Sequence, residues 1–74
     1  MGNVTIYTRP RCIWCFLAKR LLRKRGIAFE ERNAQDDQTR KVLLERTNRR
    51  TVPQVFFGEV SVGGYEDLKA RLAR

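Results

Sequence analysis

A strand, a helix and a second strand follow one another at the start of this chain, and that succession limits the available folds more than any other feature. Residues 4–7 are β-branched or aromatic, which predicts a strand. Residues 13–25 place leucines at helical spacing opposite a basic face, and Gly26 ends the predicted helix. Residues 27–31 predict a short, half-apolar second strand. A β-α-β unit has a right-handed crossover and pairs its strands in parallel.

The second half of the chain predicts a helix, a hairpin and a last helix. Residues 37–47 are preceded by a polar stretch that can cap a helix. Residues 55–57 and 60–62 are strands separated by two residues, a connection typical of an antiparallel hairpin. Residues 65–73 again have leucines one helical turn apart. The predicted fold class is therefore α/β, in the order β-α-β-α-β-β-α, with helices flanking a four-stranded mixed sheet.

Length and composition exclude several classes of protein. The chain has 74 residues, which predicts a single domain over residues 1–74. It has no apolar run long enough for a transmembrane helix. Its first residues lack the basic and then apolar segments of a secretory signal, so we expect a cytoplasmic protein. It contains no histidine, which excludes histidine metal sites, catalytic triads and imidazole general bases.

The two cysteines, Cys12 and Cys15, lie at the predicted junction between the first strand and its helix. A bridge between them closes almost no loop, so it adds little stability. Free N–H groups and the helix dipole favour an anion at a helix N-terminus, and that anion can be the thiolate of Cys12. Arg9 and Arg11 add positive charge nearby. Cys15, one turn into the helix, is expected to be shielded from solvent, to keep a higher pKa than Cys12 and to lie within disulfide reach of Cys12.

Two other interpretations of the cysteine pair compete with a redox role. A structural zinc site needs four ligands, and the chain offers two cysteines and no histidine. Two buried, inert thiols are the other alternative, because cysteine is often a small core residue. A C-x-x-C motif at a strand-to-helix junction of a β-α-β unit favours redox chemistry over both.

Four segments of the chain, in order, resemble the glutaredoxins. They are Tyr7-Thr8-Arg9-Pro10-Arg11-Cys12-Ile13-Trp14-Cys15, Arg49-Arg50-Thr51-Val52-Pro53-Gln54-Val55-Phe56, Gly58, and Gly63-Gly64-Tyr65-Glu66-Asp67-Leu68. The resemblance implies a thioredoxin-like fold, which has the element order predicted above. It also implies that Cys12 is the nucleophile, that Cys15 is the resolving thiol, and that Pro53 is a cis proline beside them.

The resemblance further implies a binding site for glutathione. Val52 would pair its backbone with the tripeptide like an added strand. Arg9 and Arg40 suit the glycine-end carboxylate, the start of the last helix suits the γ-glutamyl carboxylate, and Asp67 suits the ammonium. The alternative for Asp67 is a helix cap, and the alternative for Trp14, as a wall of the groove, is core packing. The expected glutathione-binding residues are Arg9, Trp14, Arg40, Thr51, Val52, Pro53, Gly64, Tyr65, Glu66 and Asp67.

The chain departs from the commonest glutaredoxin active site at two positions. Ile13 and Trp14 stand where proline and tyrosine are usual, and the loss of the proline leaves the turn less rigid. Glutaredoxins without that proline include members that hold a [2Fe-2S] cluster between two protomers with glutathione. A cluster wants four thiolates, so two Cys12 side chains and two glutathiones would complete it. The alternative function is therefore an iron-sulfur carrier that is dimeric only with its cluster.

The predicted function is that of a glutathione-dependent thiol-disulfide oxidoreductase. Cys12 would reduce protein disulfides and glutathione mixed disulfides, with glutathione as reductant and disulfide-bonded or glutathionylated proteins as partners of a monomer. The alternative within enzymes is a ribonucleotide-reductase redoxin served by thioredoxin reductase. The Thr-Val-Pro and Gly-Gly-Tyr-Glu-Asp segments favour glutathione over that alternative.

Lysine and arginine together number 16 against 8 acidic residues, a formal net charge of +8. Basic clusters at residues 19–20 and 23–25 lie opposite the leucines of the predicted helix, as a solvated face would. No nucleic-acid motif accompanies them, so nucleic acid is not an expected partner. We expect the basic surface to steer anionic substrates, including glutathione and acidic proteins.

Overall fold

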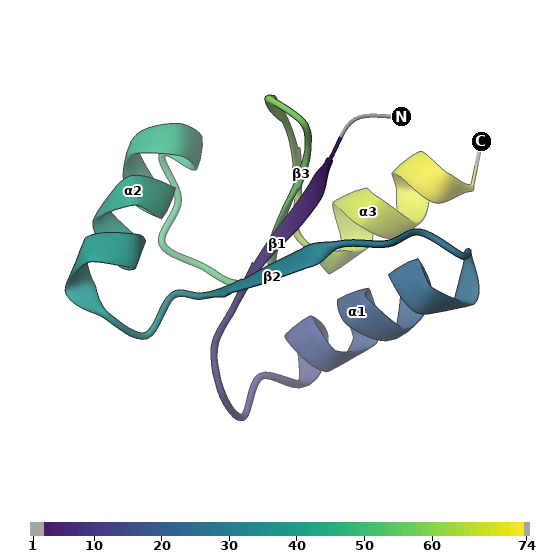
Figure 1. Ribbon diagram of the computed structural model, residues 1–74, viewed down its shortest axis with the longest axis horizontal. Helices are drawn as coiled ribbons and strands as arrows, with labels where there is room; N and C mark the ends of the chain where they lie inside the picture. Colours follow the sequence, from purple (N-terminus) through teal and green to yellow (C-terminus); the bar gives the residue numbers. More distant parts are fainter. Residues whose placement is uncertain (1–2, 74) are drawn as a thin grey trace.

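Seven elements follow one another in the predicted order β-α-β-α-β-β-α (Figure 1). The computed structural model describes residues 3–73, so residues 1–2 and 74, the ends of the predicted single domain, lie outside the described residues. The elements are β1 (Val4–Thr8), α1 (Ile13–Lys24), β2 (Glu30–Asn33), α2 (Asp37–Thr47), β3 (Gln54–Phe57), β4 (Val60–Gly63) and α3 (Tyr65–Leu72). Within residues 3–73, none of the helices has the length and hydropathy that a membrane crossing requires.

The strands form one mixed sheet in the order β2-β1-β3-β4. β1 pairs with β2 in parallel, with Thr5 opposite Glu30. It pairs with β3 in the antiparallel direction, with Ile6 opposite Val55. β3 and β4 form an antiparallel hairpin. The predicted parallel pair, hairpin and mixed sheet are therefore confirmed.

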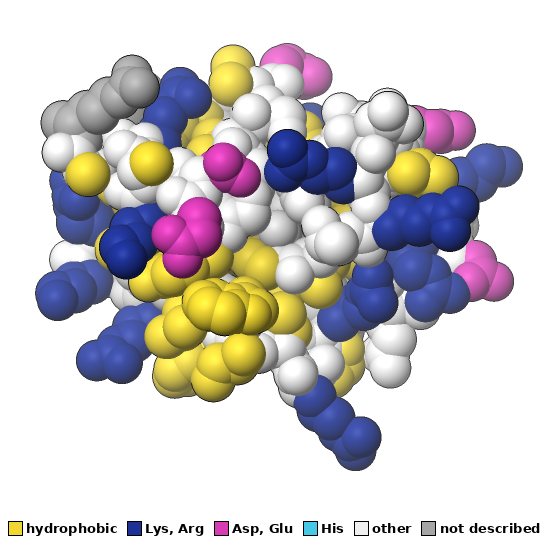
Figure 2. Space-filling model, turned by 180° about the vertical axis from the view of Figure 1, so that it is seen from behind, with side chains coloured by type: hydrophobic (Ala, Val, Ile, Leu, Met, Phe, Trp, Pro, Cys, Tyr) yellow, Lys and Arg dark blue, Asp and Glu magenta, His cyan; other side chains and the backbone are white. Residues whose placement is uncertain are grey.

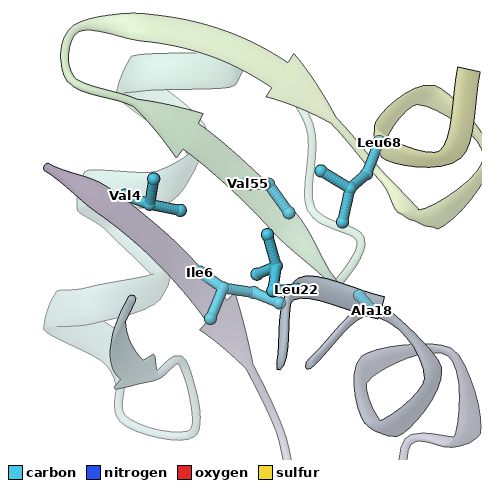
Figure 3. Close-up of a cluster of buried hydrophobic side chains, with 6 residues drawn as sticks. All are labelled: Val4, Ile6, Ala18, Leu22, Val55 and Leu68. Atoms are coloured by element: carbon cyan, nitrogen blue, oxygen red, sulfur yellow. The ribbon is translucent and has the colours of Figure 1, made fainter. Parts of the chain in front are cut away.

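Successive residues of a strand point to opposite faces of a sheet. Both faces of this sheet carry apolar side chains, and helices cover both. The cluster under α1 and α3 consists of Val4, Ile6, Ala18, Leu22, Val55 and Leu68 (Figure 3). The cluster under α2 consists of Tyr7, Ala34, Leu43 and Phe56. α1 and α3 therefore share one face and α2 covers the other, which leaves the starts of α1 and α3 close to each other at one end of the sheet (Figure 1).

The structure corrects the position of the second strand. The apolar pattern predicts it over residues 27–31, whereas β2 spans Glu30–Asn33. Ile27 and Phe29 pack against the core but precede the residues that pair with β1. The residues of β2 are all exposed, because this edge strand is held by hydrogen bonds to β1 rather than by burial of its side chains. Ile27 and Phe29, the apolar residues that suggested the strand, lie in the segment that leads into it.

The other boundaries agree with the predicted ones to within one residue. α2 begins and ends where the sequence places it, over residues 37–47. Asp36 caps its start, since the Asp36 Oδ2 accepts a hydrogen bond from the Thr39 N–H at 3.1 Å. Asn48, in the left-handed conformation with φ of 59°, ends it. Polar capping residues therefore fix this helix although only Leu43 on it is buried.

Candidate active site

Cys12 lies at the N-terminus of α1, where the sequence places it. The loop from β1 turns at Arg11, which adopts a left-handed φ of 61°, and Cys12 follows as the extended N-cap residue. The Cys12 Sγ accepts a hydrogen bond from the backbone N–H of Cys15 at 3.2 Å. Free N–H groups and the positive end of the helix dipole stabilise negative charge here. The Cys12 sulfur therefore lies at the positive end of α1.

Cys15 is the buried member of the pair, with 2% of its surface exposed. Its thiol donates to Cys12, and the two Sγ atoms of these free cysteines lie 2.6 Å apart. Burial, and then the hydrogen bond to Cys12, raises the pKa of Cys15 to about 12. The expectations that Cys15 is shielded and lies within disulfide reach of Cys12 are confirmed.

We expect iodoacetamide to modify Cys12 alone in the native protein at neutral pH. The thiolate is the reactive species, and Cys15 stays protonated until the pH approaches about 12. Mass spectrometry should find one adduct per chain, with a second only after unfolding. The raised pKa of Cys15 also makes the free energy of unfolding depend on pH. The contribution of the neutral thiol to that free energy is fully present below pH 9.0, the ordinary pKa, and is lost as the pH rises to about 12. Two adducts on the native protein at pH 7, or one on the native Cys12→Ser variant, would contradict this expectation.

A groove of about 390 Å³ opens beside Cys12, and we call it the Trp14 groove. Its lining consists of Trp14, Arg49, Thr51, Val52, Pro53, Gln54, Gly64, Tyr65, Glu66 and Asp67. The Val52 carbonyl oxygen lies 3.8 Å from the Cys12 Sγ, which joins the groove to the sulfur. The Val52–Pro53 peptide bond is cis, so the cis proline implied by the resemblance is confirmed. Eight of the ten expected glutathione-binding residues thus share one depression next to Cys12.

Trp14 forms one side of this groove. Its side chain is 51% exposed, and its ring centroid lies 5.7 Å from that of Tyr65, with the ring planes tilted by 36°. Core packing, the alternative for Trp14, is therefore wrong. The two rings join the start of α1 to the start of α3. Figure 2 shows hydrophobic side chains gathered over this part of the molecule, with Lys and Arg side chains around them.

Asp67 both lines the Trp14 groove and caps α3. Its Oδ2 accepts a hydrogen bond from the Gly64 N–H at 3.1 Å and lies 3.7 Å from the Arg49 Nη1. The capping interaction is the alternative that the sequence left open for Asp67. The carboxylate is half-exposed, so one face of it remains accessible from the groove. Gly63, which precedes the capped Gly64, has a φ of 114°. A Cβ atom added to Gly63 would collide with the Asp67 carboxylate.

Arg9 and Arg40 lie together in a neighbouring pocket of about 510 Å³ over α2. The Arg9 Nη2 donates to the Arg50 carbonyl oxygen at 2.7 Å, while its buried Nε has no partner among the described residues. Arg40 forms an ion pair with Asp37. The structure therefore brings these two predicted residues to each other and to Arg50, in a pocket separate from the Trp14 groove.

Sequence reasoning missed three residues that shape these two pockets. Arg49 lies against Asp67, and Arg50 supplies the carbonyl group that holds Arg9. Gln54 is 1% exposed; its Nε2 donates to the Thr51 Oγ1 at 3.2 Å, and its Oε1 has no partner among the described residues. These three residues flank Thr51-Val52-Pro53 in the sequence. That position next to expected binding residues was the signal that could have identified them.

Comparison with known proteins identifies the family. The family model described as Glutaredoxin matches residues 4–62. Glutaredoxin 3 of Escherichia coli (strain K12) is 40% identical over 75 residues, which cover 100% of this chain and 90% of that protein. The glutaredoxin of Neisseria meningitidis serogroup B is 40% identical over 70 residues, covering 92% of this chain and 82% of its own.

A solved structure agrees with these relatives. The solution structure of glutaredoxin from Brucella melitensis superposes with a TM-score of 0.85 at 44% identity, covering 99% of this chain and 80% of that one. The sheet order, the flanking helices and the C-x-x-C spacing at the start of α1 fit the thioredoxin-like fold. This chain belongs to the glutaredoxin family of thioredoxin-like thiol oxidoreductases.

Proposed function

We propose that this glutaredoxin is a glutathione-dependent thiol-disulfide oxidoreductase, with Cys12 as nucleophile and Cys15 as resolving thiol. The observation that carries the proposal is the Trp14 groove, which gathers eight of the expected glutathione-binding residues beside Cys12. The Cys12 sulfur is partly exposed and accepts hydrogen bonds from the Cys15 N–H and the Cys15 thiol. A nucleophilic sulfur next to a shaped groove is the arrangement that thiol exchange needs.

The groove offers complementary groups along the length of glutathione. No main-chain hydrogen bond to another described residue engages the Val52 N–H, so this group is free to pair with an extended tripeptide. The N–H groups at the start of α3 favour the γ-glutamyl carboxylate, and the exposed face of Asp67 suits the ammonium beside it. Arg9 and Arg40, in the neighbouring pocket, suit the glycine-end carboxylate.

In the reaction with a glutathionylated protein, the Cys12 thiolate attacks the sulfur of glutathione. The bond between that sulfur and the protein sulfur breaks, and the protein thiolate leaves and takes a proton. A second glutathione thiolate then attacks the glutathione sulfur held on Cys12. Oxidised glutathione leaves, and the Cys12 thiolate is restored.

In the reaction with an intramolecular protein disulfide, the Cys12 thiolate attacks one sulfur of that disulfide and forms a mixed disulfide with it. The substrate S–S bond breaks, and the other substrate sulfur leaves as a thiolate and takes a proton from water. Cys15 then loses its proton and attacks the Cys12 sulfur, which lies 2.6 Å away in the reduced pair. The protein thiolate leaves, and a Cys12–Cys15 disulfide forms. Two glutathione molecules reduce that disulfide in turn. Because Cys15 is protonated at neutral pH, it does not compete with Cys12 for the substrate.

A coupled assay tests glutathione dependence directly. We expect NADPH oxidation when the protein is given a glutathione mixed disulfide together with glutathione and glutathione reductase. NADPH with thioredoxin reductase in place of that system should give no turnover. Turnover with thioredoxin reductase alone would reject the proposal in favour of the ribonucleotide-reductase redoxin. The natural protein substrate can then be sought with the reductant known.

A second candidate function is [2Fe-2S] carriage. It is favoured by the exposed, proline-free active-site turn, where Ile13 is 63% exposed. One solved relative, 44% identical with a TM-score of 0.72, is described by the words "Metal Binding of Glutaredoxins". Within residues 3–73, one copy of the chain gathers no group of three metal-ligating side chains. A single copy therefore does not fit a cluster, and two copies with two glutathiones would be required.

Anaerobic reconstitution with iron, sulfide and glutathione separates the two candidates. A carrier should become brown, elute as a dimer and return to monomer when glutathione is removed. The Cys15→Ser variant should keep the cluster, since Cys15 is buried and is not a proposed ligand. A colourless monomer would reject the carrier function and leave the oxidoreductase as the proposal.

A further inference from the structure

A second depression lies at the cysteine pair, and it shares no lining residue with the Trp14 groove. This dithiol hollow, of about 530 Å³, is bounded by the end of β1, the loop before α1, the first turns of α1, and β2. Both Cys12 and Cys15 line it. A molecule in the hollow would therefore reach the reacting sulfurs while the Trp14 groove is occupied.

Part of the hollow is an exposed apolar surface. Ile13 and Phe16, from the first turn of α1, line it and are 63% and 52% exposed. Large hydrophobic side chains exposed together mark a surface that contacts another molecule. Glutathione, which carries two carboxylates and an ammonium, has no large apolar side chain to place there. A polypeptide does.

The rest of the hollow carries positive charge. Its charged lining residues are Arg9, Arg11, Lys19 and Glu31. The Glu31 Oε2 accepts hydrogen bonds from the Thr8 hydroxyl at 2.6 Å and the Lys19 ammonium at 2.9 Å. These contacts hold the pKa of Glu31 below its usual range, so its carboxylate stays ionised and pairs with Lys19.

Arg9 and Arg11 are the two cations of the hollow that this pairing does not neutralise. Arg9 donates to the Arg50 carbonyl oxygen and is proposed above for glutathione, which leaves Arg11 for a second ligand. No carboxylate of residues 3–73 forms an ion pair with Arg11, and Arg11 is exposed. It directly precedes Cys12 in a turn whose left-handed backbone is fixed at φ of 61°. Arg11 and Cys12 therefore line the same hollow.

We infer that the dithiol hollow seats an acidic segment of a substrate protein, with a carboxylate on Arg11 and an apolar side chain on Phe16 and Ile13. The inference rests on the proposed function and adds the substrate class. With glutathione in the Trp14 groove, the Cys12 thiolate attacks the glutathione sulfur and forms a disulfide with it. The bond to the substrate sulfur breaks, and the substrate thiolate leaves on the side of Arg11 and is protonated by water.

Two glutathionylated peptides test this inference. Both have one cysteine and an adjacent leucine, and they differ only in having two flanking glutamates or two glutamines. For the native protein at low salt, we expect kcat/KM to be about threefold to fivefold higher for the acidic peptide, as one partly exposed ion pair allows. Arg11→Gln should bring this ratio close to one. High salt should do the same to the native protein.

The matched control is Lys24→Gln, which removes the same charge at the far end of α1, outside the hollow. It should leave the ratio as in the native protein. Equal loss of the ratio in both variants would show that net charge alone attracts the acidic peptide, and it would overturn the inference. A ratio of one in the native protein would overturn it as well. The ratio cancels any effect of Arg11 on the chemistry of Cys12.

A binding measurement separates this inference from the proposed function. The same peptides, with serine in place of the glutathionylated cysteine, are titrated into the Cys12→Ser protein, so that no exchange takes place. Tighter binding of the acidic peptide, lost with Arg11→Gln, supports the hollow as a seat even if glutathione fails as reductant in the coupled assay. Equal binding of both peptides rejects the seat even if that assay succeeds.

Discussion

Replacing Cys12 with serine is expected to reduce thiol-disulfide exchange to the uncatalysed background. A serine hydroxyl is not ionised at neutral pH and forms no disulfide with a substrate. The chain has two cysteines, and the remaining one, Cys15, is buried and protonated. The measurement is glutathione-coupled NADPH oxidation with a glutathione mixed disulfide as substrate. A Cys12→Ser protein that still removed glutathione from that substrate would disprove the role of Cys12.

Cys15→Ser is the matched variant for this experiment, because it makes the same change one helical turn away. It should keep the reaction with the glutathione mixed disulfide, which needs Cys12 alone. It should lose the reduction of intramolecular protein disulfides, because no resolving thiol remains and the mixed disulfide on Cys12 persists. The trapped intermediate should be visible as a covalent complex on a non-reducing gel. Equal loss of both reactions would mean that Cys15 acts through the structure of the site.

Gly63→Ala is expected to give the largest loss of stability of any glycine-to-alanine change within residues 3–73. At Gly63 φ is 114°, a conformation that alanine avoids, and the added Cβ would collide with the Asp67 carboxylate. Asp67 would have to move and release the Gly64 N–H that it caps. We expect the free energy of unfolding in urea to fall by about 2–4 kcal/mol. The KM for glutathione should rise, since the start of α3 lines the Trp14 groove.

Gly58→Ala provides the control, because Gly58 has a φ of 63° with nothing within 4 Å of an added Cβ. It should lose only about 1 kcal/mol, the cost of the left-handed conformation. A second test adds Asp67→Ala to Gly63→Ala. If the collision is the cause, the double variant should lose less stability than the two single losses added together. Equal effects of Gly63→Ala and Gly58→Ala would reject the collision.

The sequence predicted those parts of the fold that depend on local signals. α2 was located to the residue because Asp36 and Asn48 cap its ends, and the hairpin followed from its two-residue turn. β2 was misplaced because its position depends on pairing with β1, and that pairing involves exposed, polar residues. The pattern of hydrophobic residues in a sequence indicates which side chains are buried. An edge strand with no buried side chain, such as β2, is therefore hard to locate from that pattern.

The sequence likewise predicted those parts of the candidate site that depend on local signals and on the resemblance. The cysteine geometry follows from a strand-helix junction, and the resemblance supplied most of the lining of the Trp14 groove. The contact of Arg49 with Asp67 and the separate pocket of Arg9 and Arg40 could not be predicted. They depend on how the loop after α2 lies against α3 and against the loop after β1. Spacing along the chain carries no information about such approaches between distant segments.

The position of β1 in the sheet has a consequence for synthesis of the protein. β1 is made first, yet its antiparallel neighbour is β3, which begins at Gln54. The ribosome therefore exposes Cys12 and Cys15 well before the strand that closes the centre of the sheet, and before α3 completes the groove. During that interval the nascent chain carries two thiols with neither the burial that protects Cys15 nor the groove that selects what reaches Cys12. A reducing compartment, or a chaperone over the first 50 or so residues, would keep the pair reduced until the sheet closes.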